Sequence, residues 1–227
     1  MMKLSVGDPS IIWNSIQPQS DEKTVVIIDG TTVREVGYTT EAISVFEFEN
    51  EVAVRRVQTL SSREIGNRVT TSEILRSNFQ PISHLDESDE QKISIRYDGT
   101  RVIGKKRVVG GEDTHIERFI SSGVFDYHTL EMIIRLLPFK EKYTVDVPVY
   151  HAQLDQELDV KVGVIGIEKV DVGLDALGAW VVETDWGYVR QWYWIGMKDK
   201  LLLRQSMFPR EGFEIHFVRK PKRLDGE

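Results

Sequence analysis

Short segments in which apolar and polar residues alternate run through most of this chain. A period of two places the apolar side chains on one face of an extended segment, so the pattern predicts β-strands. Glycine-containing pairs such as Asp29-Gly30, Asp98-Gly99 and Gly110-Gly111 separate several of these segments and predict tight hairpins. The predicted strands are residues 24–28, 33–38, 43–49, 52–60, 70–76, 82–85, 93–97, 101–109, 115–120, 154–164, 179–184, 188–195, 201–207 and 213–218.

Two stretches interrupt this pattern between residues 76 and 91. Pro81 cannot donate a hydrogen bond to a neighbouring strand, which predicts a break or an edge position. The acidic run at residues 86–90 predicts a solvated turn.

The most regular alternation lies at residues 154–164, which we expect to form one long antiparallel strand with a dry face and a wet face. Gly163 and Gly166 indicate a bulge or bend near its end. The carboxylates of Asp155, Glu157 and Asp159 share one face. Such a row can bind calcium or supply an acid and a base, but a wet face with cross-strand Lys or Arg partners is the more common structure and is favoured here.

One segment, residues 122–139, instead has helical periodicity. Its apolar positions at i, i+3, i+4 and i+7 are Leu130, Ile133, Ile134 and Leu137. Asp126 is a candidate N-cap, and Pro138 ends the segment because it restricts the preceding residue and lacks an amide hydrogen. We expect a helix over about residues 127–137, and a helix this apolar needs a sheet to cover it.

Many strands with one central helix predict a mainly β protein, in which a strongly curved antiparallel sheet or partial barrel holds the helix against its concave face. The length of 227 residues fits one β-rich domain spanning residues 1–227, with irregular termini at 1–20 and 219–227. Because β patterning is continuous, we expect the first 69 residues to belong to the same sheet.

Composition narrows the functional classes. The net charge of −7 disfavours nucleic acid as a partner, since phosphates require a basic surface. The chain has no cysteine, which excludes disulfides, thiolate nucleophiles and cysteine-bound zinc. The N-terminus lacks the apolar run of a signal peptide, and no stretch has the length of a membrane span. The sequence as written therefore predicts a cytoplasmic protein, or an extracytoplasmic one if a leader has been removed.

Motifs for catalysis or cofactor binding are not found. The five histidines are His84, His115, His128, His151 and His216. None of them stands in an HxH or HExxH pattern, and no serine stands in GxSxG. His128 falls in the first turn of the predicted helix, where a cavity position is conceivable, but a lone histidine more often has a structural role. We predict no catalytic residues, no metal site and no cofactor.

Aromatic residues concentrate near the C-terminus, with three tryptophans at 180, 192 and 194. On a strand Trp192 and Trp194 share one face and Tyr193 takes the other. Core packing explains much of this, while the mouth of a barrel-like sheet is also a common ligand site. The candidate ligand-lining residues are Trp180, Trp192, Trp194, Leu130 and Ile134.

Four stretches together resemble the bacterial family called domain of unknown function 3108. They are ILRSNFQPISHL, ISIRYDGTRVIGKK, GVFDYHTLEMIIRLLPF and GAWVVETDWGYVRQWYWIGMKDKLLLRQS, and the resemblance spans roughly residues 70–218. It implies a curved antiparallel sheet with a helix in its concavity, similar to the half-barrels of lipoprotein carriers that hold acyl chains. It supplies no catalytic residues, and members of the family usually carry an export signal.

Three functions follow as hypotheses. The first is a non-enzymatic binding protein that buries an apolar or lipid-like ligand between helix and sheet. The second is a structural or assembly module that binds a protein, including its own copy, through sheet edges or aromatic patches. The third, an enzyme, requires a polar cleft with a perturbed histidine or carboxylate, which the sequence does not indicate.

Overall fold

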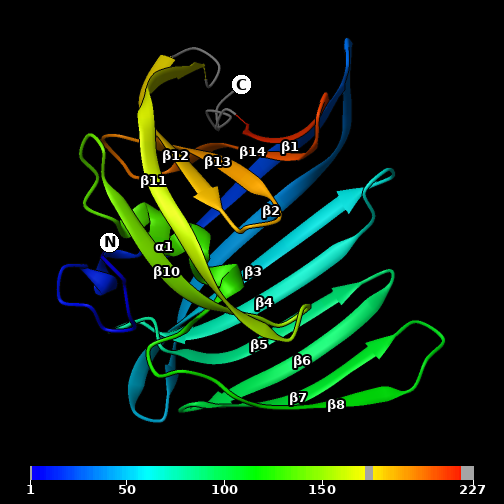
Figure 1. Cartoon of the computed structure of the whole chain (residues 1–227), viewed down its shortest axis with the longest axis vertical. Coiled ribbons are helices and arrows are strands. Elements are labelled where there is room, and N and C mark those ends of the chain that lie inside the picture. Colours follow the sequence, from blue (N-terminus) through cyan, green and yellow to red (C-terminus); the bar gives the residue numbers. More distant parts are fainter. Residues whose placement is uncertain (1, 172–175, 221–227) are drawn as a thin grey trace, which may run out of the picture.

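The computed structural model of the chain describes residues 2–171 and 176–220. Within these residues, fifteen strands form one sheet that curls around a short helix, α1 (Figure 1). The strands are β1 (Gln19–Asp29), β2 (Thr32–Phe48), β3 (Glu51–Ser62), β4 (Arg68–Leu75), β5 (Pro81–Ser88), β6 (Gln91–Asp98), β7 (Arg101–Val108), β8 (Asp113–Phe119), β9 (Phe125–Asp126), β10 (Thr144–His151), β11 (Gln156–Asp171), β12 (Ala176–Asp185), β13 (Arg190–Gly196), β14 (Leu202–Arg210) and β15 (Phe213–Arg219).

The order across the sheet is β8-β7-β6-β5-β4-β3-β2-β1-β15-β14-β13-β12-β11-β10-β9. Neighbours are antiparallel except β9 and β10, which run parallel. Pairing of β1 with β15, for example Val25 with Phe217, joins the N-terminal half of the sheet to the C-terminal half. The prediction of a strongly curved antiparallel sheet with a helix on its concave face is confirmed, and strands β1 to β3 belong to that sheet as expected.

Tight turns lie where glycine pairs predicted them. Gly30 (φ 59°) and Gly99 (φ 61°) adopt the left-handed backbone conformation that a side chain disfavours, and they connect β1 to β2 and β6 to β7. The predicted bulge is also present, because the register between β11 and β12 shifts between Val164 and Gly166.

Two local predictions were wrong, and a third was confirmed in only one of its two alternatives. Asp155 (φ 53°) lies in a turn, so β11 begins at Gln156 and Leu154 is exposed rather than part of a dry face. The acidic run is not a solvated turn throughout, because β5 continues to Ser88 and the side chain of Asp86 is completely buried. Pro81 does mark a break, but it opens β5, which lies between β4 and β6 and not at an edge.

The helix is shorter than predicted and begins as a single 3-10 turn, η2 (Tyr127–Thr129), followed by α1 (Leu130–Leu136). Asp126 is the N-cap, and its side chain accepts a hydrogen bond from the backbone N–H of His128. Leu137 leaves the helical conformation directly before Pro138, as the restriction on residues before proline requires.

The main apolar core fills the space between α1 and the concave face of the sheet. The N-terminal segment contributes to it although it is irregular apart from the 3-10 turn η1 (Trp13–Ser15). Its core side chains are Leu4, Ile11, Trp13 and Ile16. At the other terminus, strand β15 includes Arg219, and the tail at 221–227 lies outside the described residues. The helices of the described part of the chain are too short to cross a membrane.

Candidate ligand-binding site

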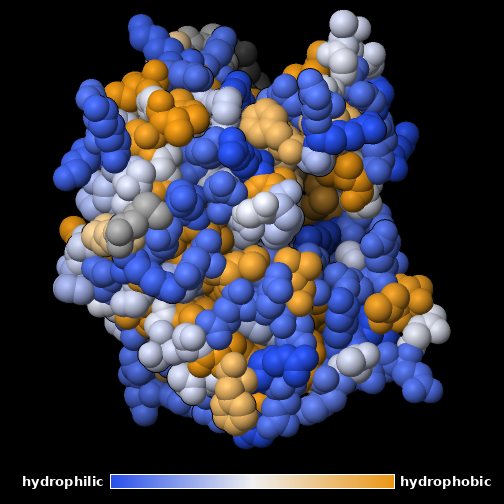
Figure 2. Space-filling model, viewed as in Figure 1, coloured by the Kyte–Doolittle hydropathy of each residue, from blue (hydrophilic) through white to orange (hydrophobic). Residues whose placement is uncertain are grey.

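A cavity of about 320 Å³ lies beside the N-terminal end of α1 and is partly open to solvent. Its walls come from β1 to β4, from η2 and the start of α1, and from β13 to β15 with the turn before β13. Figure 2 shows the surface hollowed near the centre of this view, with hydrophilic and hydrophobic atoms side by side in the hollow.

Part of the cavity wall is apolar. The pairing of β1 with β15 and of β14 with β15 explains why side chains distant in sequence meet here, since directly paired residues share a face. The apolar lining residues are Leu60, Leu130, Trp186, Val189, Met207 and Phe217.

The opposite part of the wall is charged and held by buried ion pairs. Arg56 of β3 donates from Nε to Glu41 Oε1 (3.1 Å) and from Nη2 to Glu131 Oε2 (2.5 Å). Lys23 of β1 lies 3.0 Å from Asp21 and 3.7 Å from Glu41. This network ties α1 to β1, β2 and β3, and all of these side chains are at least nine-tenths buried.

The ion-pair network changes the pKa values of two of its members, Glu41 and Arg56. Burial alone raises the pKa of Glu41, but the charges of Arg56, Lys23 and Arg135 outweigh burial and lower it to about 2. The pKa of Arg56 is raised because Glu131 and Glu41 together outweigh the opposing effect of burial.

Three buried polar atoms of the cavity wall have no hydrogen-bond partner among the described residues. They are Thr39 Oγ1, Glu131 Oε1 and His151 Nδ1. A buried polar group without a partner costs about 1–3 kcal/mol, and these three atoms have almost no accessible surface, so they are enclosed in the wall and do not open onto the cavity.

Two histidines of the wall are held neutral. Burial, together with the charge of Arg68, lowers the pKa of His151 to about 4. Burial and the neighbouring His84 and Arg68 lower the pKa of His128 well below its usual range. Tyr127 stacks on His151 with ring centroids 4.0 Å apart, and burial raises the pKa of this tyrosine well above its ordinary value.

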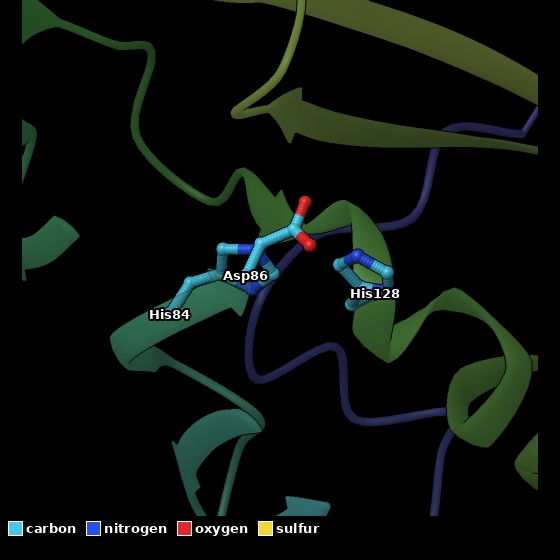
Figure 3. A group of neighbouring side chains, drawn as sticks. All are labelled: His84, Asp86 and His128. Atoms are coloured by element: carbon cyan, nitrogen blue, oxygen red, sulfur yellow. The ribbon is translucent and has the colours of Figure 1, made fainter. Parts of the chain in front are cut away.

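One group of side chains has the composition of a metal site. His84 and Asp86 project from β5 toward His128 of η2 (Figure 3). One ligand atom from each residue lies within 4.8 Å of the others. The sequence analysis missed this group because His128 is 42 residues from Asp86 (128 − 86), although His84 and Asp86 already stood two positions apart on one strand face.

Two serine–histidine contacts lie outside the cavity wall. Ser72 Oγ and Asp126 Oδ2 both face the same nitrogen of His84, Nδ1, at 3.2 Å, whereas a catalytic triad uses opposite ring nitrogens. His216 does have partners at opposite ring nitrogens, Ser206 Oγ at Nδ1 (2.6 Å) and Glu214 Oε2 at Nε2 (2.8 Å), but Ser206 is completely buried and does not line the cavity.

The structure separates the residues predicted to line a ligand site. Leu130 lines the cavity, whereas Ile134 lies in the main core and Trp180 packs against that core beside Phe139. Trp192 and Trp194 belong to a separate apolar cluster with Val181 and Leu203. Their strand alternates as predicted, so Tyr193 is the side chain that β13 directs into the cavity together with Gln191.

The predicted row of carboxylates is divided among separate partners. Asp159 pairs with Lys3 (2.8 Å) and Asp155 pairs with Arg118 (2.6 Å). Glu157 accepts a hydrogen bond from the backbone N–H of Ser121. Basic side chains pair with Asp155 and Asp159, as the favoured interpretation expects, but none of the three partners lies on a strand paired with β11, so they are not the cross-strand neighbours that were predicted.

Comparison with known proteins identifies the family. The profile of the protein family of unknown function DUF3108 matches residues 25–211. This chain belongs to that family. The match begins at residue 25 rather than 70, so it includes the strands that carry Glu41 and Arg56.

A solved structure with a similar fold is the β-barrel-like protein of domain of unknown function DUF1849 from Brucella abortus. It is 13% identical, with a TM-score of 0.51, and the similarity covers 89% of this chain and 95% of that protein. At this identity the similarity concerns the fold alone. No curated protein matches the sequence.

Proposed function

We propose that this protein is a non-enzymatic binding protein for a small lipid-like ligand, held between the start of α1 and the curved sheet. The observation that supports this most strongly is the mixed wall of the cavity. Apolar side chains such as Met207 and Phe217 line the space together with polar side chains such as Gln58 and Arg68.

The mixed wall favours an amphipathic ligand over a purely apolar one. Removing apolar surface of the ligand from water against Leu60, Met207 and Phe217 contributes about 25 cal/mol per Å². A polar head group then supplies hydrogen bonds to polar lining side chains such as Gln58 and Thr70, which a hydrocarbon does not. The volume of about 320 Å³ lies at the lower end of the range for small-molecule sites, which is roughly 300–1,000 Å³.

A binding role is favoured over catalysis because the histidines of the cavity lack an acidic partner suited to proton transfer. Arg68 Nη2 lies 3.4 Å from His128 Nε2 and donates to Asp86 Oδ2, so the carboxylate near this ring is already paired with a cation. An assembly role through sheet edges is disfavoured because edge strand β8 presents Asp113, His115, Glu117 and Arg118 to solvent, and charged edges resist pairing with another strand.

Native mass spectrometry of gently purified protein tests the proposal directly. We expect a releasable adduct with the mass of a small lipid, and the denatured protein should have the mass of the chain alone. A fluorescence titration with the apolar anion 1-anilinonaphthalene-8-sulfonate complements this, with saturable binding expected for the wild type.

The matched variants are Met207→Trp, which fills the cavity, and Val33→Trp, which adds the same group at an exposed position outside it. Met207→Trp should lose the adduct and bind the dye at least about tenfold more weakly, because the added ring occupies the apolar part of the site. Val33→Trp should keep both the adduct and the dye affinity of the wild type. A clean native mass together with equal dye binding by both variants contradicts the proposal.

A further inference from the structure

Two imidazoles and one carboxylate converge beside the cavity. Because His84 and Asp86 are two positions apart on β5, their side chains lie on the same, concave side of the sheet. Segment η2 brings His128 beside them (Figure 3), with its ring stacked on that of His84 at a centroid distance of 4.7 Å. Imidazole nitrogen with carboxylate oxygen is a donor set that suits Zn²⁺ and related transition-metal ions.

His84 has the environment of a prepared metal ligand. Its side chain is completely buried, and Nδ1 faces Asp126 Oδ2 at 3.2 Å. Ser72 Oγ also contacts Nδ1 at 3.2 Å, so the polar neighbours of this ring gather at Nδ1. The Nε2 atom has no hydrogen-bond partner among the described residues. A metal-binding histidine usually has its other ring nitrogen held by a second polar group, which is the position that Ser72 and Asp126 occupy here.

The supporting carboxylate is itself held in place. Asp126 accepts hydrogen bonds from the hydroxyl of Tyr97 (3.0 Å) and from the backbone N–H of His128 (2.8 Å). Asp126 therefore positions both histidines, His84 through its side chain and His128 through its backbone.

Arg68 supplies the cation that now faces the group. Its Nε and Nη2 donate to the two oxygens of Asp86 at 2.7 and 2.5 Å. Asp86 is completely buried, but the side chain of Arg68 is 29% exposed at the cavity wall and can withdraw toward solvent. Gln153 Nε2 also donates to Asp86 Oδ2 (2.9 Å), so the carboxylate stays oriented when the guanidinium leaves.

We propose that His84, Asp86 and His128 form a binding site for a divalent transition-metal ion of the Zn²⁺ class, and that this ion and Arg68 alternate as the cation that neutralises Asp86. Of the three residues, His128 lines the cavity, whereas His84 and Asp86 are buried behind its wall. This site does not depend on the proposed lipid-like ligand, so zinc binding and ligand binding are separable by experiment.

Titration of the full-length, chelator-treated protein with Zn²⁺ against a chromophoric chelator tests the proposal. We expect one equivalent of Zn²⁺ per chain and a loss of at least about tenfold in affinity for His84→Gln and for His128→Gln, because each removes one ligand. The matched control is His115→Gln on edge strand β8, where the side chain is exposed and should not contribute.

Arg68→Gln gives a result that a merely structural role does not predict. Removing the guanidinium leaves Asp86 free and removes a like charge near the ion, so Zn²⁺ affinity should rise by about tenfold or more. Circular dichroism verifies that each variant is folded. The proposal is overturned if folded Arg68→Gln binds no Zn²⁺. It is also overturned if His84→Gln binds Zn²⁺ as tightly as the control His115→Gln and the wild type do.

Discussion

Both sides of helix α1 are buried, but different interactions attach them to the sheet. On one side Ile133 and Ile134 are completely buried in the apolar core. On the other side Glu131 and Arg135 are also buried, and they face Arg56 and Glu41 of the sheet. Burial alone therefore does not describe how this helix is docked.

The two sides of α1 should differ in how much stability a single substitution removes. An apolar contact that is partly removed loses stability in proportion to the area and the cavity left behind. An ion-pair network buried from water is favourable only when it is complete, because a single remaining charge keeps its full desolvation cost. The charged side of α1 should thus respond to one substitution more sharply than the apolar side.

The largest effect is expected for Arg56→Met. This change leaves Glu41 and Glu131 without the guanidinium that they share, so the free energy of unfolding should fall by roughly 3–5 kcal/mol. Urea unfolding measures it. The control is Arg101→Ala, which removes an exposed pair with Glu117 at 2.5 Å and should cost roughly 0–1 kcal/mol.

A double variant sharpens this result. Arg56→Met combined with Glu131→Gln removes a charge from each side of the pair and should be less destabilised than the sum of the two single variants. Strict additivity in this cycle would show that Arg56 and Glu131 do not depend on each other and would contradict the account of the charged side.

The next effect is expected for Ile134→Ala on the apolar side. Loss of this completely buried side chain should reduce the free energy of unfolding by about 3 kcal/mol, through the lost burial and the cavity that remains. Ile12→Ala is the matched control, since Ile12 is 71% exposed and its truncation should change stability by less than about 0.5 kcal/mol. Equal costs for the two variants would refute the packing described for α1.

The smallest effect concerns pH. Because the pKa of Glu41 is lowered from 4.5 to about 2 in the folded state, its ionised form stabilises the protein above about pH 4.5, and this contribution is lost as the pH falls toward 2. This lowering of the pKa from 4.5 to about 2 corresponds to at most about 3–4 kcal/mol. Within a working range of pH 6 to pH 3, only part of it is lost.

Urea unfolding of the wild type and of Glu41→Gln across this range isolates the contribution. The stability difference between them should shrink as the pH falls, because both proteins share every other titrating group. A difference that stays constant with pH would show that Glu41 does not gain stability from Arg56, Lys23 and Arg135. The apolar variant Ile134→Ala should give such a constant difference.

Much of the candidate site was outside the reach of sequence patterns. Leu130 was predicted to line a ligand site, and the structure places it in the cavity wall. Trp192 and Trp194 were chosen for their aromatic character, but strand alternation places them in another cluster and directs Tyr193 inward. Sequence supplied that alternation without indicating which of the two faces is concave.

A signal for the charged wall was present in β3. Arg56, Gln58 and Leu60 alternate on one strand face, and all three line the cavity. Polar residues at alternate positions normally indicate a solvent-exposed face. The pattern therefore showed which residues share a face of the strand, but not that this face is buried. Only the partners across the concavity, Glu131 and His128, show that this face is buried.

The sequence by itself determined the local structure: the hairpin turns at Gly30 and Gly99, the alternation of the strands, and a helix that is capped by Asp126 and ended by Pro138. These features depend on backbone conformations and hydrogen bonds between residues that are neighbours in the chain. The tertiary structure alone decided which polar residues are buried together. Curvature of the sheet around α1 brings Arg56 to Glu131 and His84 to His128, and no local preference encodes contacts over such separations.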